Sequence, residues 1–179
     1  SNNLVHLFIG QNDTSYHESE IKHLILEHRP GLKDTAWEIK TTIAHEELPL
    51  LRLRTIPERF FFGTPNKVSG FLRGLYSANG SICGKRVTLK AVSKPLIEQV
   101  QQMLSSLGIK SYTTMNRSRE NTFPNGVYTM LESYDLNISV DKDVFASKIG
   151  FLQPYKTDKL KNLLQTQSGS GKINYDITE

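Results

Sequence analysis

The chain has 179 residues, of which 37% are hydrophobic and 22% charged, values typical of a folded globular domain. Its single cysteine, Cys83, excludes an internal disulfide and a zinc site of several cysteines, so we expect a reducing intracellular setting, cytoplasmic or nuclear. No apolar run approaches the roughly 20 residues that cross a bilayer, so the sequence predicts a soluble protein without a membrane partner.

The net charge of +4 is unevenly distributed along the chain. Residues 84–119 carry seven basic side chains against one acidic one, Glu98. This excess predicts an anionic partner, although an ordinary solvated face would have the same composition. The basic residues are Lys85, Arg86, Lys90, Lys94, Lys110, Arg117 and Arg119.

The first 55 residues predict one helix and three strands. Their apolar spacing places a strand at 4–9, a helix at 15–28, and a hairpin of two strands at 35–44 and 50–54. Lys40, Arg52 and Arg54 occupy outward positions of that hairpin. We therefore expect these three side chains to belong to a polar sheet surface.

The stretch GFLRGLYSANG, residues 70–80, contains the end of a predicted helix over residues 66–78. Asn66 is the expected cap of this helix, and Gly80 is expected to end it. Small residues four positions apart share one side of this helix and would let another helix backbone approach closely. The same pattern also arises where a helix packs tightly against a strand. The small residues are Gly70, Gly74 and Ala78.

The remaining elements are a strand at 86–92, a helix from Ser93 to Gly108, strands at 110–117 and 127–139 joined by a polar loop, and helices at 142–149 and 157–165. In the first of these strands Arg86, Thr88 and Lys90 alternate with apolar residues and face outward. The polar loop contains Arg119. The pattern therefore predicts an α+β fold with a basic sheet surface.

The stretches FLRGLYSANGSI, SKPLIEQVQQMLSSLGI and YDLNIS with FASKIGFLQPYKTDKL, in this order, resemble the LAGLIDADG homing endonucleases, especially the kind inserted in inteins. The resemblance runs from about residue 56 to 164. It implies αββαββα repeats whose four-stranded antiparallel sheets form a DNA-binding saddle. It also implies double-stranded DNA as the partner.

On this resemblance, residues 1–55 are a partial first repeat without its motif helix, 56–165 a LAGLIDADG-like repeat, and 166–179 a flexible tail. Family members pair two motif helices at the centre of the saddle. The small residues of the helix at 66–78 therefore imply a partner helix. We expect it from a second copy of the chain, which would make a homodimer, or from a missing segment.

The chain departs from the family at the metal ligand. The family motif ends in Asp-x-Asp-Gly, but Ser77, Ala78, Asn79 and Gly80 stand here. In the family two such carboxylates hold divalent cations that activate the attacking water. Asn79 offers a carbonyl oxygen without the negative charge that Mg²⁺ prefers. We therefore expect metal binding and cleavage at Asn79 to be weak or absent.

Three explanations of Asn79 stay open at this point. The residue is an engineered replacement that silences the site while keeping its shape, or the product of natural decay, which the change at Ser77 mildly favours. Alternatively, the Asn79-Gly80 pair deaminates readily at the side-chain amide, and an aged sample would regain some aspartate.

The resemblance also implies a basic residue near the scissile phosphate, best matched by Lys156, with Lys159 as the fallback. A solvated lysine at a helix start is the alternative for either. DNA recognition does not require the missing acids, because phosphate contacts and arginine contacts to guanine supply it. The predicted DNA-binding residues are Lys40, Arg52, Arg54, Lys85, Arg86, Thr88, Lys90, Arg117 and Arg119.

The sequence thus predicts site-specific binding of double-stranded DNA, with Mg²⁺-dependent phosphodiester cleavage lost or weakened at Asn79. The alternative is a non-catalytic transcriptional regulator that uses the same fold to bind DNA. A third hypothesis is an RNA-binding splicing helper.

Overall fold

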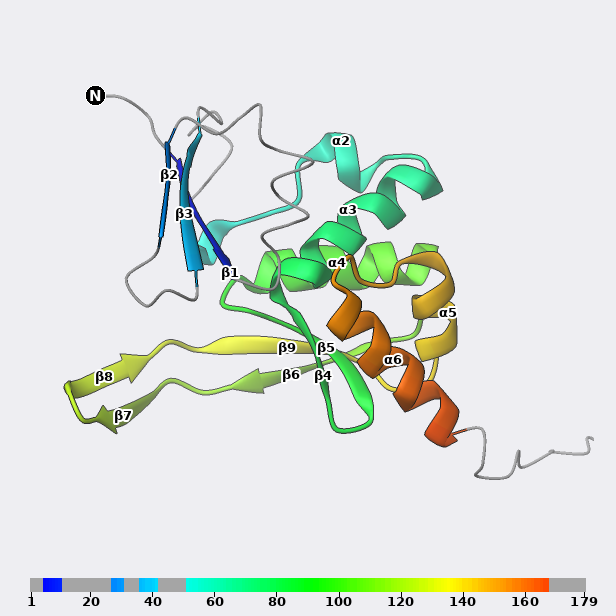
Figure 1. The fold of residues 1–179 in the computed structure, drawn as a ribbon. Coiled ribbons are helices and arrows are strands. Elements are labelled where there is room, and N and C mark those ends of the chain that lie inside the picture. Colours follow the sequence, from blue (N-terminus) through cyan, green and yellow to red (C-terminus); the bar gives the residue numbers. More distant parts are fainter. Residues whose placement is uncertain (1–4, 11–26, 31–35, 42–50, 168–179) are drawn as a thin grey trace, which may run out of the picture. The chain divides into compact units, whose positions relative to one another are not determined.

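The computed structural model describes residues 5–10, 27–30, 36–41 and 51–167 (Figure 1). The chain forms two compact units, residues 1–50 and 51–179. Within the described ranges, no helix is long and apolar enough to cross a membrane. The predicted tail lies almost entirely outside them.

The described strands of the first unit form a three-stranded antiparallel sheet in the order β1-β3-β2. Its strands are β1 (Val5–Gly10), β2 (Glu27–Pro30) and β3 (Ala36–Thr41). The strands predicted at 4–9 and 35–44 are confirmed. The helix predicted at 15–28 lies mostly outside the described residues, and its last two residues are wrong because they begin β2.

The hairpin predicted between 35–44 and 50–54 is wrong. β3 pairs with β1 and β2, and the later segment contains a short 3₁₀ helix, η4 (Leu51–Leu53). The backbone after η4 bonds to side chains of a helix instead of a strand: Ser93 Oγ donates to Arg54 O at 2.6 Å, and Ile56 N donates to Gln99 Oε1 at 2.7 Å. Tertiary contacts therefore override the alternating Leu-Arg pattern.

The second unit begins with two helices and contains a four-stranded antiparallel sheet in the order β4-β5-β9-β6. Its elements are α2 (Glu58–Phe61), α3 (Pro65–Asn79), β4 (Gly80–Cys83), β5 (Arg86–Ala91), α4 (Lys94–Ser106), β6 (Tyr112–Asn116), β7 (Arg119–Phe123), β8 (Gly126–Met130), β9 (Ser133–Ile138), α5 (Lys142–Lys148) and α6 (Pro154–Gln167). This order confirms the predicted α+β class and αββαββα repeat.

A second hairpin stands where the sequence predicted a polar loop and a single long strand. β7 and β8 pair from Arg119 opposite Met130 to Phe123 opposite Gly126, and they extend away from the main sheet (Figure 1). Arg119 is therefore a strand residue. The exposure of nearly all the hairpin side chains removed the one-sided apolar alternation that would have predicted a strand.

Capping hydrogen bonds, glycine and proline determine where α3 and α4 begin or end. Ser93 Oγ accepts the backbone N–H of Leu96 at 3.3 Å, as expected of a cap, and Gly108 ends α4 in the left-handed region with φ 77°. The cap of α3 is Thr64 instead of the predicted Asn66, because Pro65 supplies the first helical residue.

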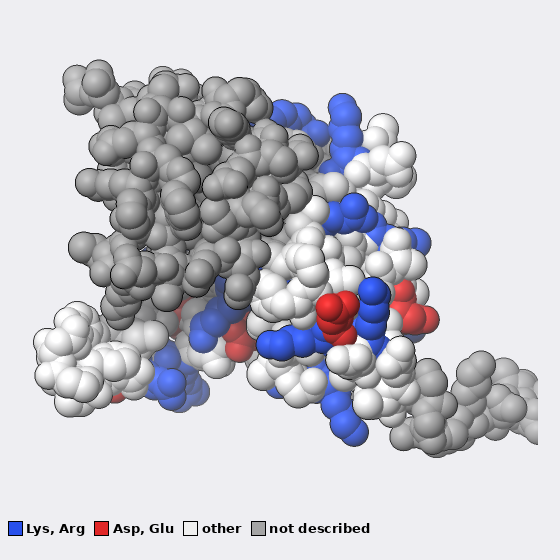
Figure 2. All heavy atoms as spheres, in the orientation of Figure 1, with Lys and Arg blue, Asp and Glu red and all other residues white. Residues whose placement is uncertain are grey.

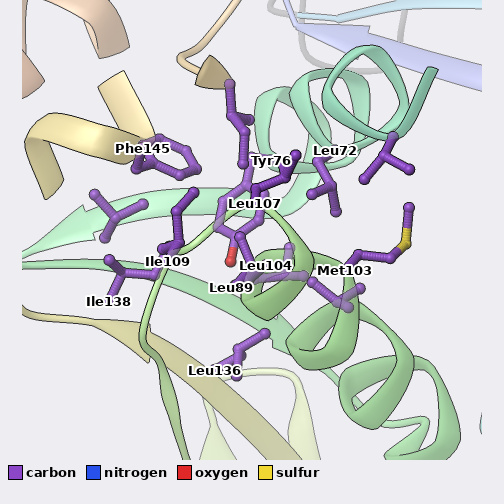
Figure 3. Packing of buried hydrophobic residues seen from close by; sticks show 14 of the residues in the cluster. Leu72, Tyr76, Leu89, Met103, Leu104, Leu107, Ile109, Leu136, Ile138 and Phe145 are labelled. Atoms are coloured by element: carbon purple, nitrogen blue, oxygen red, sulfur yellow. The ribbon is translucent and has the colours of Figure 1, made fainter. Parts of the chain in front are cut away.

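The core lies between the helices and one face of the main sheet (Figure 3). Leu72 and Tyr76 of α3 pack there with Leu89 of β5 and Leu104 of α4, all almost completely buried. The rings of Tyr76 and Phe145 pack edge to face, with centroids 4.9 Å apart. Burial also raises the pKa of Tyr76 well above its usual range. The buried face of α3 is thus fixed, which orients its opposite side.

The junction between α3 and β4 has no connecting residue. Gly80 caps the helix, its N–H bonds to Tyr76 O, and the same residue opens β4 opposite Leu89. A Cβ on Gly80 would lie 2.5 Å from Tyr76 O and 2.8 Å from its Cδ1. Glycine is required here by close approach rather than by its backbone angles, since φ is −83°.

We expect Gly80→Ala to lower the free energy of unfolding by about 1–3 kcal/mol, because the added methyl meets backbone that cannot move cheaply. The matched control is Gly74→Ala, where a Cβ would meet nothing within 4 Å. That change should be neutral or stabilise the helix by up to about 1 kcal/mol. Urea unfolding of both variants measures the difference, and equal effects would contradict the steric explanation.

Candidate nucleic-acid interface

The strand register places a set of polar side chains on the sheet face opposite the core. Residues aligned across antiparallel strands share a face, and Thr88 is opposite Asn137, which in turn is opposite Tyr112. Val87 and Leu136 point the other way, into the core. We call this set the polar sheet face; it comprises Arg86, Thr88, Lys90, Tyr112, Thr114, Asn116, Asp135 and Asn137.

Hydrogen bonds cross-link the middle of the polar sheet face. Thr88 Oγ1 donates to Asn137 Oδ1 at 3.0 Å, and Asn137 Nδ2 donates to Thr114 Oγ1 at 3.3 Å. Arg86 Nη1 donates to the Tyr112 hydroxyl at 3.2 Å, a bond that raises the pKa of Arg86. Thr88 is only 9% exposed, so it supports this face from within, whereas the edges of the face remain open.

Predicted DNA-binding cations gather where this face meets the second hairpin. Lys90 of β5, Arg117 after β6 and Arg119 of β7 are exposed and line a groove of about 700 Å³ together with Asn116 and Thr129. We call it the hairpin groove. Figure 2 shows basic side chains at the base of this hairpin, at lower left, and none at its tip. The groove therefore combines positive charge with hydrogen-bonding groups.

The other predicted cations are more dispersed. Lys85 is exposed in the turn between β4 and β5, and Arg52 is exposed on η4. Arg54 and Lys90 line a second pocket, of about 380 Å³, which also contains Asn79. Lys40 lies in β3 of the first unit, and its side chain falls outside the described part.

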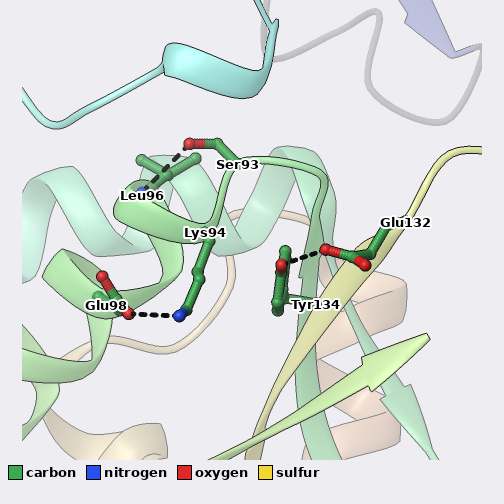
Figure 4. A network of polar contacts seen from close by, with 6 residues as sticks. All are labelled: Ser93, Lys94, Leu96, Glu98, Glu132 and Tyr134. Carbon is green, nitrogen blue, oxygen red and sulfur yellow. Dashed lines mark hydrogen bonds and ion pairs between the residues drawn. The ribbon is translucent and has the colours of Figure 1, made fainter. Parts of the chain in front are cut away.

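Glu98, the one acidic residue in the basic segment 84–119, forms an ion pair with Lys94. Lys94 Nζ and Glu98 Oε1 lie 3.5 Å apart, one turn apart on α4 (Figure 4). Nearby, the Tyr134 hydroxyl donates to Glu132 Oε1, and this bond raises the pKa of Tyr134. The side chains of Lys94 and Glu98 are exposed, so this ion pair contributes little to stability. Because α4 packs on the core side of the sheet, Lys94 does not add to the polar sheet face.

The carboxyl end of α3 is held by the segment that begins α6. Ser77 is buried, and its Oγ accepts the Leu152 N–H at 2.8 Å. Gln153 Nε2 donates to Ser77 O at 2.8 Å, while Lys156 Nζ donates to Ser77 O at 2.6 Å and to Gly80 O at 2.9 Å. We call these contacts the helix clasp. Two of them satisfy the carbonyl of Ser77 in the last turn of α3, where carbonyls have no partner within the helix.

The helix clasp brings Lys156 beside Asn79 although the two are far apart in sequence. The Lys156 ammonium bonds on either side of Asn79, and it also lies 5.8 Å from the centre of the Phe151 ring. A cation at the carboxyl end of a helix interacts favourably with the negative end of the helix dipole. Lys159, the fallback candidate, is exposed on α6.

The residues around Asn79 do not fit a divalent cation. Asn79 is exposed and neutral, and the pocket that contains it is lined by Arg54 and Lys90 without any acidic side chain. Among the described residues, no group of three or more His, Cys, Asp or Glu could hold a metal. Mg²⁺ prefers anionic oxygen ligands, and the local charge here has the opposite sign.

The predicted helix interface is open on the described part of the second unit. Gly70, Gly74 and Ala78 are exposed, and a Cβ at either glycine would meet nothing within 4 Å. Their spacing therefore does not arise from packing against a strand of the same unit.

Several residues of this region were not predicted from the sequence. Asp135 and Asn137 alternate with Leu136 and Ile138 along β9, which is a detectable period-two signal. Tyr112, Thr114 and Asn116 of β6 carried no clear one, because Thr113 between them is also polar. The amide of Leu152 and the side chain of Gln153 carried no such signal, because their partner in the helix clasp is more than 70 residues away.

Residues 66–150 match the model of a family described as a LAGLIDADG-like domain. The DNA polymerase of Thermococcus sp. (strain GE8) is 33% identical over 127 residues, 66% of this chain, and that of Thermococcus hydrothermalis is 34% identical over 133 residues, 69% of this chain. The match spans only 7% and 8% of the two polymerases.

Three solved structures share the fold. I-DmoI in complex with DNA and Ca superposes with a TM-score of 0.54 at 20% identity, covering 89% of this chain and 83% of that one. A variant of I-DmoI with its target DNA and manganese gives 0.52 at 22% identity, covering 82% and 78%. Full-length DUF199/WhiA from Thermatoga maritima gives 0.55 at 16% identity, covering 94% and 55%.

We expect Ser77→Ala to destabilise the second unit by about 1–3 kcal/mol, because the Leu152 N–H would lose its acceptor. Ser81→Ala is the control, since Ser81 is exposed on β4. That variant should stay within about 0.5 kcal/mol of the parent. Chemical unfolding monitored by circular dichroism compares them, and equal stabilities would mean that the bond between Leu152 N–H and Ser77 Oγ contributes little.

Proposed function

We propose that this chain, whose residues 66–150 match the LAGLIDADG-like family, binds a specific double-stranded DNA site along the polar sheet face. The proposal further holds that magnesium-dependent cleavage is lost or weakened at Asn79. The main support for DNA binding is the hairpin groove, which is lined by Lys90, Arg117 and Arg119 together with Asn116.

Each part of this surface has a distinct role in the proposed complex. The cations Lys90, Arg117 and Arg119 would neutralise phosphates and hold the register of the duplex. Arg86 presents a guanidinium fixed by Tyr112, a geometry suited to guanine edges. The core-side helices hold the sheet rigid, so these groups are organised before DNA arrives.

The proposed loss of cleavage rests on charge. In a two-carboxylate site each acid helps to concentrate a divalent cation at the scissile phosphate. Here Asn79 supplies only a neutral oxygen, and Arg54 and Lys90 line the pocket that contains it. Lys156 bonds to the backbone carbonyls of Ser77 and Gly80 on either side of Asn79 in sequence. Such surroundings favour a bound phosphate over a bound Mg²⁺. Lys156 would still stand near that phosphate, as the family resemblance implies.

The assembly and the setting belong to the same proposal. The matched stretch is a small fraction of two DNA polymerases, which is consistent with an endonuclease domain inserted in a longer protein as part of an intein. The open face of Gly70, Gly74 and Ala78 would pair with the motif helix of a second copy or of a segment outside this chain.

The second candidate function is a transcriptional regulator that binds DNA without cutting it. The neutral Asn79 supports this alternative, because a protein that only binds DNA needs no acidic side chain in that pocket, whereas a metal-dependent nuclease does.

We expect DNA affinity to fall steeply with salt, with a slope of about −0.9 for each phosphate contacted. Lys90→Ala and Arg117→Ala should each reduce that slope by about 1. Lys94→Ala is the control, because this exposed lysine lies on α4 and pairs with Glu98. Titrations of a duplex from a randomised library at several salt concentrations measure the slopes, and an affinity independent of salt would contradict the proposed surface.

We expect Asn79→Asp to restore detectable nicking of the selected duplex in Mg²⁺ or Mn²⁺, because it returns one metal-binding carboxylate to the end of α3. Asn79→Ala should bind the same duplex without nicking, and a chelator should stop the reaction of the aspartate variant. Supercoil-relaxation and end-labelled assays detect single breaks. If the aspartate and alanine variants are equally inert, the regulator is the better explanation.

A further inference from the structure

Asn116 is the exposed amide at the edge of the polar sheet face. It is the last residue of β6, and it lines the hairpin groove with Lys90 and Arg117. It therefore lies among cations suited to phosphates, yet it carries no charge itself. A neutral donor and acceptor at such a place is suited to contact a base edge.

The orientation of the Asn116 amide is set by Asp135. Asn116 Nδ2 donates to Asp135 Oδ2 at 3.0 Å. A carboxylate only accepts hydrogen bonds, so the NH₂ group of Asn116, not its oxygen, must face Asp135. Within the described residues, one N–H and the carbonyl oxygen of Asn116 remain for another partner. This donor and acceptor, side by side, match the N7 and N6 groups of adenine in the major groove.

Asn137 on the same face provides the contrast. Its Oδ1 accepts from Thr88, and its Nδ2 donates to Thr114 Oγ1 and to Asp135 O at 3.0 Å. It is only 2% exposed. Its hydrogen bonds are thus satisfied inside the sheet, which leaves Asn116 as the open amide of the polar sheet face defined above.

We propose that Asn116 reads an adenine in the bound duplex and that Asp135 is the positioning residue that holds its amide in the reading orientation. The proposal rests on DNA binding as the function of this face. It assigns base discrimination to a residue outside the basic set, whereas Lys90 and Arg117 set the affinity.

The test is a base-substitution scan of a duplex selected from a randomised library, with binding measured for the parent and four variants. The parent should prefer A·T at one position, and Asn116→Ala should flatten that preference by about tenfold, as expected for a lost bidentate contact. Lys90→Ala should weaken binding to every duplex alike.

Asp135 is tested by its effect on the same position. Asp135→Ala should flatten the same preference without changing the others, and Asp135→Asn, which keeps an acceptor, should retain most of it. This base-specific readout separates positioning from a general loss of stability. An unchanged profile in Asn116→Ala, or a preference lost at other positions in Asp135→Ala, overturns the assignment while DNA binding stands. A parent that binds no duplex overturns both the assignment and the proposed function.

Discussion

The close approach between Gly80 and Tyr76 sets the geometry on which the rest of the second unit depends. Because the helix passes into β4 without a loop, the carboxyl end of α3 lies directly at the edge of the sheet. The register of β4 and β5 then follows from Gly80 opposite Leu89. Asn79 is therefore joined directly to the sheet that carries the polar sheet face, with no loop between the helix and the first strand.

The helix clasp changes how the residues beside Asn79 are interpreted. Ser77 accepts a backbone N–H and is buried, so a serine there has a structural role of its own and gives no support to natural decay. Lys156 bonds to two carbonyls at the same end. The backbone around Asn79 is thus held in place, and none of the described residues that line the pocket containing it is acidic.

The sequence predicted α3, β5 and α4 well, because each has strong apolar spacing and local end signals such as Ser93 and Gly108. It failed where tertiary contacts decide. The backbone near Arg54 bonds to α4, so an alternating segment does not become a strand. Likewise, the orientation of Asn116 depends on Asp135 across a strand pairing that one-dimensional spacing does not give.

Binding and cleavage have different physical requirements in such a site. Affinity for DNA comes from many phosphate contacts and a few base contacts spread over the sheet, so no single residue carries it. Cleavage needs negative charge concentrated at one point to hold a metal ion. An amide at Asn79 removes that charge but leaves the shape of the helix end, because Gly80 and the helix clasp determine the shape. Under the proposed function, a change of one heavy atom in a side chain would therefore separate the two activities while the surface that would meet DNA stays the same.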